Sequence, residues 1–442
     1  MISVNVTKGY NLAISGRPSS EIRKLKKPDR VAFLPERIPF VTPRLLVKVD
    51  DPVKIGSVLF EDKQNTDLKF LSPGSGRVSE INFGPRRVIR EIVIELEKEE
   101  QFADFRKMTD SEIRTLDRES LVRMLMQGGV WPLIRELPFR GIADPKIQPD
   151  SIWVVLGNQE PFQPFPEVYL KGREALFSFG LKILKRFGVP VNVSAPDYLR
   201  LQGLDIMITH RVQGQYPALD PGVVLYKTKK SAAENTSWYV SGQDLPAIAS
   251  LLKNGHYPIE RIAVAAGSRA QNSGHFQTRV GVPVSAIIPE LSLDETCFAG
   301  GLLTGYEVNS NSFLGLYETS LTCIPKGDQA ELFGFLRPGF GKPSFSRTFL
   351  SRFRKKPFDM DNGMHGEQRA CVNCGSCTRI CPVDILPQYT IKCLGADAIE
   401  EALAHGLLDC VECGLCSYVC PSKIEIREIL QKARRDYYKE QR

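Results

Sequence analysis

Two cysteine runs near the end of the chain constrain its fold and chemistry more than any other feature. They read Cys371-Val-Asn-Cys374-Gly-Ser-Cys377-Thr-Arg-Ile-Cys381-Pro382 and Cys410-Val-Glu-Cys413-Gly-Leu-Cys416-Ser-Tyr-Val-Cys420-Pro421. Both follow the spacing C-x2-C-x2-C-x3-C-P, which is typical of chains that bind two [4Fe–4S] clusters. Three thiolates from one tight loop can reach three irons of one cluster. The fourth cysteine, which precedes proline, then serves the other cluster.

This spacing assigns four ligands to each cluster. One set is Cys371, Cys374, Cys377 and Cys420, and the other is Cys410, Cys413, Cys416 and Cys381. Structural zinc sites use two C-x-x-C pairs instead, and disulfides are disfavoured in a reducing compartment. Cys393, Cys297 and Cys323 lie outside both runs, and we expect them to pack as small core residues. Apolar residues recur at helical spacing within 391–408, and 424–438 continues as an amphipathic helix. These features predict an α-helical dicluster ferredoxin module, which passes single electrons and makes no bonds itself.

Length and charge limit the number of domains and the kinds of partner that the chain can have. The 442 residues suffice for about two to four domains. We find no apolar run long enough to span a membrane and no signal-peptide pattern at the N-terminus, so we expect a cytoplasmic chain. The net charge of +7 is mild, and aromatic residues do not interleave with basic ones as in a stacking platform, so no nucleic-acid partner is expected. Of two basic clusters, 23–30 and 347–356, the second also contains Phe349, Leu350 and Phe353. It would suit a membrane surface or an acidic protein partner, or be an ordinary solvated face.

The pattern of predicted elements divides the chain into four domains. Residues 1–100 are rich in short strands, at 45–49, 58–60, 69–71, 77–81 and 89–95, and resemble the barrel-sandwich hybrid fold of biotinyl and lipoyl domains. Residues 101–257 form an α/β pattern, with helices at 109–126, 169–187 and 244–253 and strands at 151–156, 189–193 and 205–209. Residues 258–345 form a second β-rich domain of β-grasp type, similar to an SLBB domain. Residues 346–442 comprise a polar linker and the cluster module.

With these pieces in order, nearly the whole chain resembles the A subunits of the Na+-translocating NADH:quinone reductase. The resemblance rests on KVDDPVKIGSVLFEDKQNTDLKFLSPGSGRV, GGVWPLIRELPFRGIADP, ELFGFLRPGFGKPSFSRT and CSYVCPSKIEI. The C subunit of the Rnf complex and the flavin subunit of complex I share this multi-domain plan. The familiar sodium-pump A subunits have lost most of the cluster cysteines. This chain keeps all eight, as the Rnf C subunit does.

One departure concerns the flavin. In complex I and in the C subunit of Rnf, a GxGGAGFP loop cradles FMN and admits NADH, because glycines let backbone N–H groups approach a phosphate. Here the loop reads Met126-Gln-Gly128-Gly129-Val130-Trp131-Pro132. We expect the bulk of Trp131 to fill the flavin space, and therefore neither FMN nor NAD is expected to bind.

The resemblance implies a peripheral electron-transfer subunit on the cytoplasmic face of the inner membrane, part of a sodium-translocating NADH:quinone reductase or an Rnf-like complex. Its partners would be membrane subunits and a soluble electron donor or flavin subunit, and a quinone contact is possible in such a family. The alternative is an Rnf-C-like, FMN-containing subunit that oxidises NADH itself. A scaffold with structural clusters is a third reading.

Overall fold

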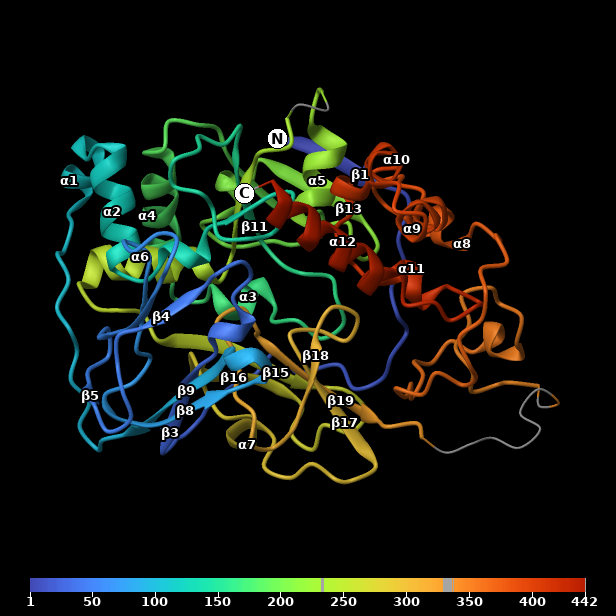
Figure 1. The fold of residues 1–442 in the computed structure, drawn as a ribbon, viewed down its shortest axis with the longest axis horizontal. Helices are drawn as coiled ribbons and strands as arrows, with labels where there is room; N and C mark the ends of the chain where they lie inside the picture. Colours follow the sequence, from blue (N-terminus) through green and yellow to red (C-terminus); the bar gives the residue numbers. More distant parts are fainter. Residues whose placement is uncertain (232–233, 329–335, 337, 442) are drawn as a thin grey trace.

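The computed structural model describes residues 1–231, 234–328, 336 and 338–441 (Figure 1). Part of the predicted 258–345 domain, residues 329–335 and 337, lies outside the described residues. The described strands form four sheets, two of six strands, one of four and one of three. Among the described residues, no helix is long and apolar enough to cross a membrane.

The two smaller sheets form a sandwich near the N-terminus. One has the order β3-β9-β8-β5 and the other β4-β6-β7. Their strands are β3 (Arg30–Phe33), β4 (Pro43–Leu45), β5 (Pro52–Val53), β6 (Val58–Asp62), β7 (Lys69–Leu71), β8 (Gly76–Phe83) and β9 (Ile89–Leu96). Phe33, Phe60 and Phe70 fill the space between them, with the last two rings stacked 4.4 Å apart. The strand predicted at 45–49 is wrong over 46–49, because the strand observed here, β4, covers Pro43–Leu45 instead.

The first two strands of the chain, β1 and β2, do not belong to this sandwich and instead add to two other sheets. β1 (Ile2–Val6) pairs in parallel with β13, and β2 (Ile22–Lys24) pairs in parallel with β16. Such partners, for example Ile2 with His210 and Ile22 with His275, are far apart in the sequence and leave no local signal in it. The first 25 residues therefore join three parts of the fold together.

The α/β domain is built on a six-stranded sheet with the order β1-β13-β12-β11-β14-β10. All neighbours are parallel except the edge pair β10–β14. The remaining strands are β10 (Arg135–Glu136), β11 (Ile152–Val155), β12 (Val191–Pro196), β13 (His210–Gly214) and β14 (Trp238–Ser241). β11 reads Ile-Trp-Val-Val and is buried at every residue, as expected for a central parallel strand.

Successive residues of β11 face two different apolar cores. Ile152 and Val154 pack into the core that contains α2 (Arg118–Gln127), α4 (Glu174–Lys185) and α6 (Asp244–Asn254). Trp153 points to the opposite face, where α5 (Pro221–Thr228) and the cysteine-rich module share a second core. The cysteine module therefore covers one face of the α/β sheet.

In the α/β domain, two predicted helices are interrupted, and one predicted strand does not form. The 109–126 helix divides into α1 (Asp110–Thr115) and α2 because Asp117 caps α2 and accepts a 2.8 Å hydrogen bond from the Ser120 amide. The 169–187 helix divides into α3 (Pro166–Tyr169) and α4, with Gly172 in a left-handed conformation between them. Residues 205–207 form a 3-10 turn, and the strand starts at His210 instead.

The second six-stranded sheet has the order β18-β17-β19-β15-β16-β2. Its strands are β15 (Glu260–Ala266), β16 (Gly274–Arg279), β17 (Glu295–Ala299), β18 (Tyr306–Val308) and β19 (Ser320–Pro325), and α7 (Val284–Ile287) follows β16. Cys297 and Cys323, expected to be isolated, face each other across β17 and β19 with their Sγ atoms 2.8 Å apart. Both are fully buried, as expected of core residues.

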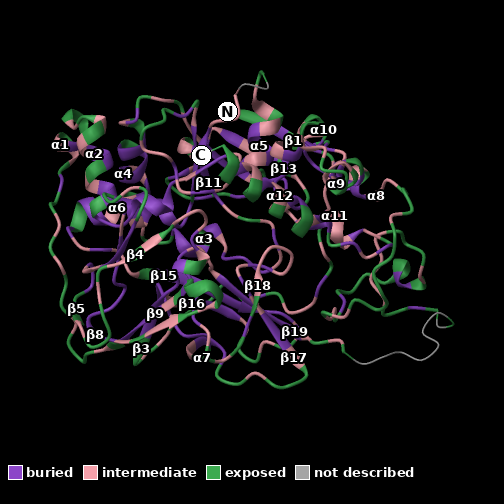
Figure 2. Ribbon diagram, in the orientation of Figure 1, coloured by how far each residue is buried: buried purple, intermediate pink, exposed green. Residues whose placement is uncertain are grey.

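Short helices dominate the C-terminal module at the right of Figure 1. They are α8 (Ser376–Ile380), α9 (Pro387–Gly395), α10 (Ile399–Ala404), α11 (Leu415–Tyr418) and α12 (Ile426–Glu440). The helical pattern at 391–408 is interrupted near Asp397, which has a positive φ of 54°. Figure 2 shows mostly exposed residues in the loops that precede this module.

Candidate metal centres

The two cysteine runs follow the same backbone path. Asn373 and Glu412, just before the second cysteine of each run, both have φ near +55°. Gly375 and Gly414, just after it, are left-handed as well and start α8 and α11. A left-handed residue at this point favours glycine, because other residues lose energy there. Each run is thus a tight loop that turns directly into a short helix.

The loops place the eight predicted ligands around two small cavities. Cys371, Cys374, Cys377 and Cys420 line the first cavity. Cys381, Cys410, Cys413 and Cys416 line the second, which Cys377 also reaches. In each cavity, three cysteines come from one run and the fourth comes from the other run. Cys393 does not line either cavity and packs against the second apolar core instead.

This arrangement fits a cluster better than a single ion. Among the described residues, no three His, Cys, Asp or Glu side chains converge closely enough to hold one metal ion. In a [4Fe–4S] cluster each iron takes one cysteine, so the thiolates stand around the cluster and do not meet at one point. The donor set of each cavity is all sulfur, which suits iron–sulfur chemistry. The walls of the second cavity are largely apolar, with Ile380, Val383, Ile385, Leu415 and Leu430.

Burial disfavours free thiolates in the second cavity. It raises the pKa of the Cys381 thiol to about 11 and raises the pKa values of Cys410, Cys413 and Cys416 as well. A bound metal replaces the proton, so these thiols are available to a metal although they hold their protons without one. Cys374 differs because the Ser376 side chain beside it lowers its pKa. Cys374 is also exposed, so the first cavity has a thiol at the surface.

Sequence reasoning missed the residues that position the module. Gln388, buried at the start of α9, places its Oε1 atom 3.1 Å from Cys377 Sγ. The Tyr216 hydroxyl donates to the Cys413 carbonyl at 2.8 Å. On α12, Arg434 is 2% exposed and pairs with Glu412, and it also donates to the Pro138 carbonyl of the α/β domain. An Arg on an otherwise charged helix carries no signal that it is buried.

A large cleft of about 1460 Å³ lies beside the second cavity. Its wall includes Gly157 and Gly242, which follow the carboxyl ends of β11 and β14. In open α/β sheets, ligands bind at this edge. Val411, Glu412 and Cys413 border both the cleft and the second cysteine cavity.

In the 126–132 loop, which we expect not to bind flavin, backbone amides form hydrogen bonds with carbonyls of the preceding helix α2. The amides of Gly128, Gly129 and Val130 donate to the carbonyls of Met124, Met126 and Leu125. A cradle needs free N–H groups that point at the phosphate, and these three amides are already engaged. The loop therefore does not fit an FMN phosphate.

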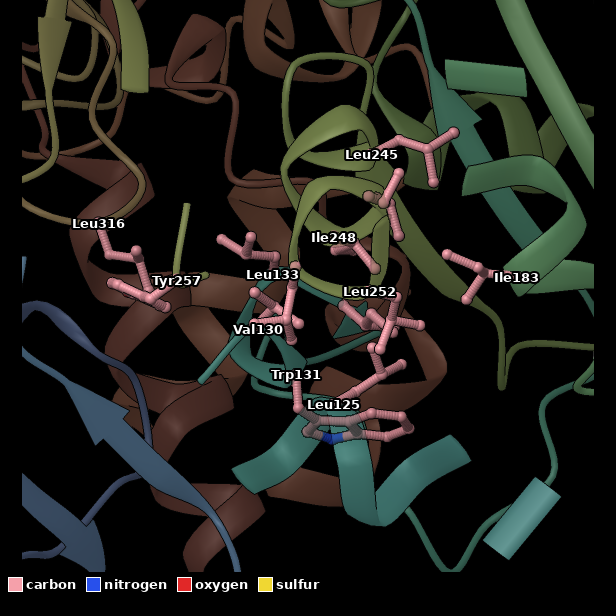
Figure 3. Packing of buried hydrophobic residues seen from close by; sticks show 14 of the residues in the cluster. Leu125, Val130, Trp131, Leu133, Ile183, Leu245, Ile248, Leu252, Tyr257 and Leu316 are labelled. Carbon is pink, nitrogen blue, oxygen red and sulfur yellow. The ribbon is translucent and has the colours of Figure 1, made fainter. Parts of the chain in front are cut away.

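Trp131, the next residue of this loop, is fully buried. Its indole lies in the apolar core near Leu125 and Leu252 (Figure 3). It packs edge-to-face with Trp238 at 5.5 Å and with Phe187 at 5.9 Å. Its Nε1 donates to the Ala143 carbonyl at 2.8 Å. Trp131 also lines the large cleft.

Comparison with known proteins places these domains in one class. Residues 4–97 match the model of the NqrA N-terminal barrel-sandwich hybrid domain, and residues 116–257 match that of the NqrA second alpha/beta domain. The chain is thus a multi-domain protein of NqrA type, with a barrel-sandwich hybrid domain followed by an α/β domain.

Individual relatives extend this match to most of the chain. The chain is 31% identical over 412 residues to the A subunit of the Na(+)-translocating NADH-quinone reductase of Histophilus somni (strain 2336), covering 92% of both chains. It is 32% identical over 421 residues to the corresponding A subunit of Actinobacillus pleuropneumoniae serotype 5b (strain L20), which also covers 92% of both. This chain therefore belongs to the family of A subunits of the Na+-translocating NADH-quinone reductase.

Proposed function

We propose that this family member is an electron-relay subunit whose C-terminal module holds two [4Fe–4S] clusters. The observation that carries the proposal is the crosswise arrangement of ligands, three from one run and one from the other around each cavity. The module would be a helical dicluster ferredoxin like that of the Rnf C subunit, and the preceding domain would be of the β-grasp, SLBB-like type. When bound, the clusters would pass single electrons.

The chain's own residues support an ordered path between the cleft and the surface. Cys413 borders both the large cleft and the second cavity, Cys377 lines both cysteine cavities, and Cys374 is exposed. The exposed fraction of Val372, next to Cys371, is 68%. A redox partner could therefore approach the first centre at this surface, while the second centre faces the cleft.

The cleft is also where we place the possible quinone contact. Quinone sites combine apolar walls with one or two polar groups. Tyr239 is 8% exposed, and its hydroxyl has no hydrogen-bond partner within the described part of the chain. Glu318 Oε2 is similarly unpartnered there, and burial raises the pKa of this carboxyl group. Both residues line the cleft and could bind a carbonyl oxygen.

We further propose that the chain binds neither FMN nor NAD, since the amides of the 128–131 loop are already engaged. Its donor would be a soluble protein or a flavin subunit, and its location would be the cytoplasmic face of the membrane beside the membrane subunits. The alternative, an FMN-containing NADH dehydrogenase subunit, would require this loop to open.

Metal analysis with matched cysteine variants tests the proposal. We expect about eight irons and eight sulfides per chain and no flavin after anaerobic purification, with cluster EPR signals after dithionite reduction. Cys420→Ser should remove the signal of the centre built on Cys371, Cys374 and Cys377. Cys381→Ser should remove the other signal, and Cys393→Ser should leave both intact.

Other outcomes would count against specific parts of the proposal. Stoichiometric zinc without sulfide would exclude the clusters. If Cys420→Ser removed the signal of the centre built on Cys410, Cys413 and Cys416, the crosswise arrangement would be wrong. One FMN per chain would move the protein to the NADH-oxidising alternative.

A further inference from the structure

The segment 338–358 presents a basic and apolar surface beside the cluster module. It contains no Asp or Glu, and its basic residues include Arg347, Arg352, Arg354, Lys355 and Lys356. All five are exposed. None of them forms an ion pair with a carboxylate in the described ranges, 1–231, 234–328, 336 and 338–441. Their charge is therefore available to an external anion.

Large apolar side chains project from the same segment. The exposed fractions are 65% for Phe340, 42% for Leu350 and 71% for Phe353. Arg352 lies over the Phe353 ring at 5.2 Å, so a cation and an aromatic ring share one site. Aromatic rings flanked by Arg or Lys are typical of residues that enter the interface between lipid headgroups and acyl chains.

The fold holds this surface in a fixed position. The Leu350 amide bonds to the Pro338 carbonyl at 3.1 Å, which closes the segment on itself. Phe358 is buried and exchanges backbone hydrogen bonds with Ala13 and Ser15. Phe345 packs edge-to-face against Tyr10 at 5.5 Å, and Tyr10 stacks on Tyr418, which lies between two predicted cluster ligands. The exposed side chains are therefore presented from the edge of the cysteine module.

We propose that this surface, residues 338–358, binds directly to anionic phospholipid. Exposed, separate apolar side chains among five cations match a negatively charged lipid interface, where each side chain can insert on its own. A folded protein partner would need a complementary pocket for each projecting ring. The inference goes beyond the proposed electron relay and does not depend on the clusters, since the segment contains no cluster ligand.

Vesicle flotation of the full chain tests the proposal. We expect binding to phosphatidylcholine vesicles that contain phosphatidylglycerol, weak binding to pure phosphatidylcholine, and release at high salt because exposed charges are screened. Lys355→Gln with Lys356→Gln should weaken the partition coefficient by about fivefold per removed charge. Phe353→Ser should weaken it by about tenfold or more, through loss of the buried ring.

Matched controls use the other exposed sites of the chain. Lys24→Gln with Lys26→Gln removes the same charge from the basic cluster near the N-terminus, and Ile206→Ser removes a side chain that is 92% exposed. Both controls should bind vesicles like the unaltered chain, and all variants should keep their iron content. Equal binding to neutral and anionic vesicles would overturn the proposal, as would equal losses in the controls. If the 353, 355 and 356 variants failed only to bind isolated membrane subunits, the surface would be a protein-docking site and the proposal would be wrong.

Discussion

Replacing Trp131 with alanine distinguishes two reasons to expect no FMN binding at the 126–132 loop. One is the bulk of the indole, and the other is that the loop amides already form hydrogen bonds. The side chain is fully buried, and it contacts Trp238 and Phe187 edge-to-face. Truncation of a buried Trp to Ala costs about 3–5 kcal/mol, because the apolar transfer energy and the new cavity add. The Nε1 hydrogen bond to the Ala143 carbonyl is also lost. We therefore expect Trp131→Ala to lower the free energy of unfolding by about 3–5 kcal/mol.

The same variant tests whether the proposed lack of FMN binding would depend on the bulk of the indole. If bulk alone were responsible, the alanine variant would gain room for the isoalloxazine ring and would bind FMN. We expect no binding, because the amides of Gly128, Gly129 and Val130 still donate to α2 and offer no donors to a phosphate. Guanidinium unfolding gives the stability change, and quenching of FMN fluorescence gives the binding.

Trp131→Phe is the matched control. Phenylalanine keeps most of the apolar contact and removes the indole donor, which leaves the Ala143 carbonyl without its side-chain partner and should cost about 1–3 kcal/mol. It should not bind FMN either. Saturable FMN binding by the folded alanine variant would refute the argument from the engaged amides and restore the argument from bulk.

Two further predictions concern buried charge and pH. Arg434→Met should destabilise the chain by about 3–5 kcal/mol, because the Glu412 carboxylate is only 15% exposed and loses its ion-pair partner while keeping the hydrogen bond from Gln431. Adding Glu412→Gln should recover part of that loss in guanidinium unfolding; no recovery would mean that the two side chains are not coupled. Burial lowers the pKa of His275, and its Nε2 accepts from the Phe165 amide while Nδ1 lies 2.7 Å from the Ser19 carbonyl. The unfolded chain then binds a proton near pH 6.5 that the folded chain resists, so the contribution of His275 to stability is complete above pH 6.5 and falls as the pH drops below it. The stability difference between the unaltered chain and His275→Gln should therefore shrink between pH 7.5 and pH 5.5, and a constant difference would contradict this reasoning.

Local sequence signals predicted the elements whose causes are local. The strand predicted at 151–156 contains β11, and the helix predicted at 244–253 lies within α6, which ends just before the left-handed Gly255. The interruptions were not anticipated, although their signals were present. Asp117 is a good N-cap residue inside an apparent helix, and Gly172 is a poor helix former. In both cases the apolar periodicity continued across the break and concealed it.

Long-range pairing could not be predicted in the same way. β1 and β2 are short strands whose partners, β13 and β16, lie far along the chain, so only tertiary contacts decide where they add. The contact between Cys297 and Cys323 likewise depends on the register of β17 against β19. The cysteine spacing was informative for the opposite reason, because three of the four cysteines around each cavity come from one short run of the sequence.

The cysteine module is contacted by three other domains of the chain. Arg427 on α12 donates to the Thr304 carbonyl of the second six-stranded sheet's domain, while Tyr216 of the α/β domain donates to Cys413. Phe40 of the N-terminal sandwich lies 3.9 Å, ring to ring, from Tyr438 at the end of α12. Three separate domains therefore hold one small module in place. A site that must keep a fixed geometry needs such support from rigid elements. Two of these three domains, the N-terminal sandwich and the α/β domain, are the ones that match the family models, so the contacts of Phe40 and Tyr216 with the module come from family domains.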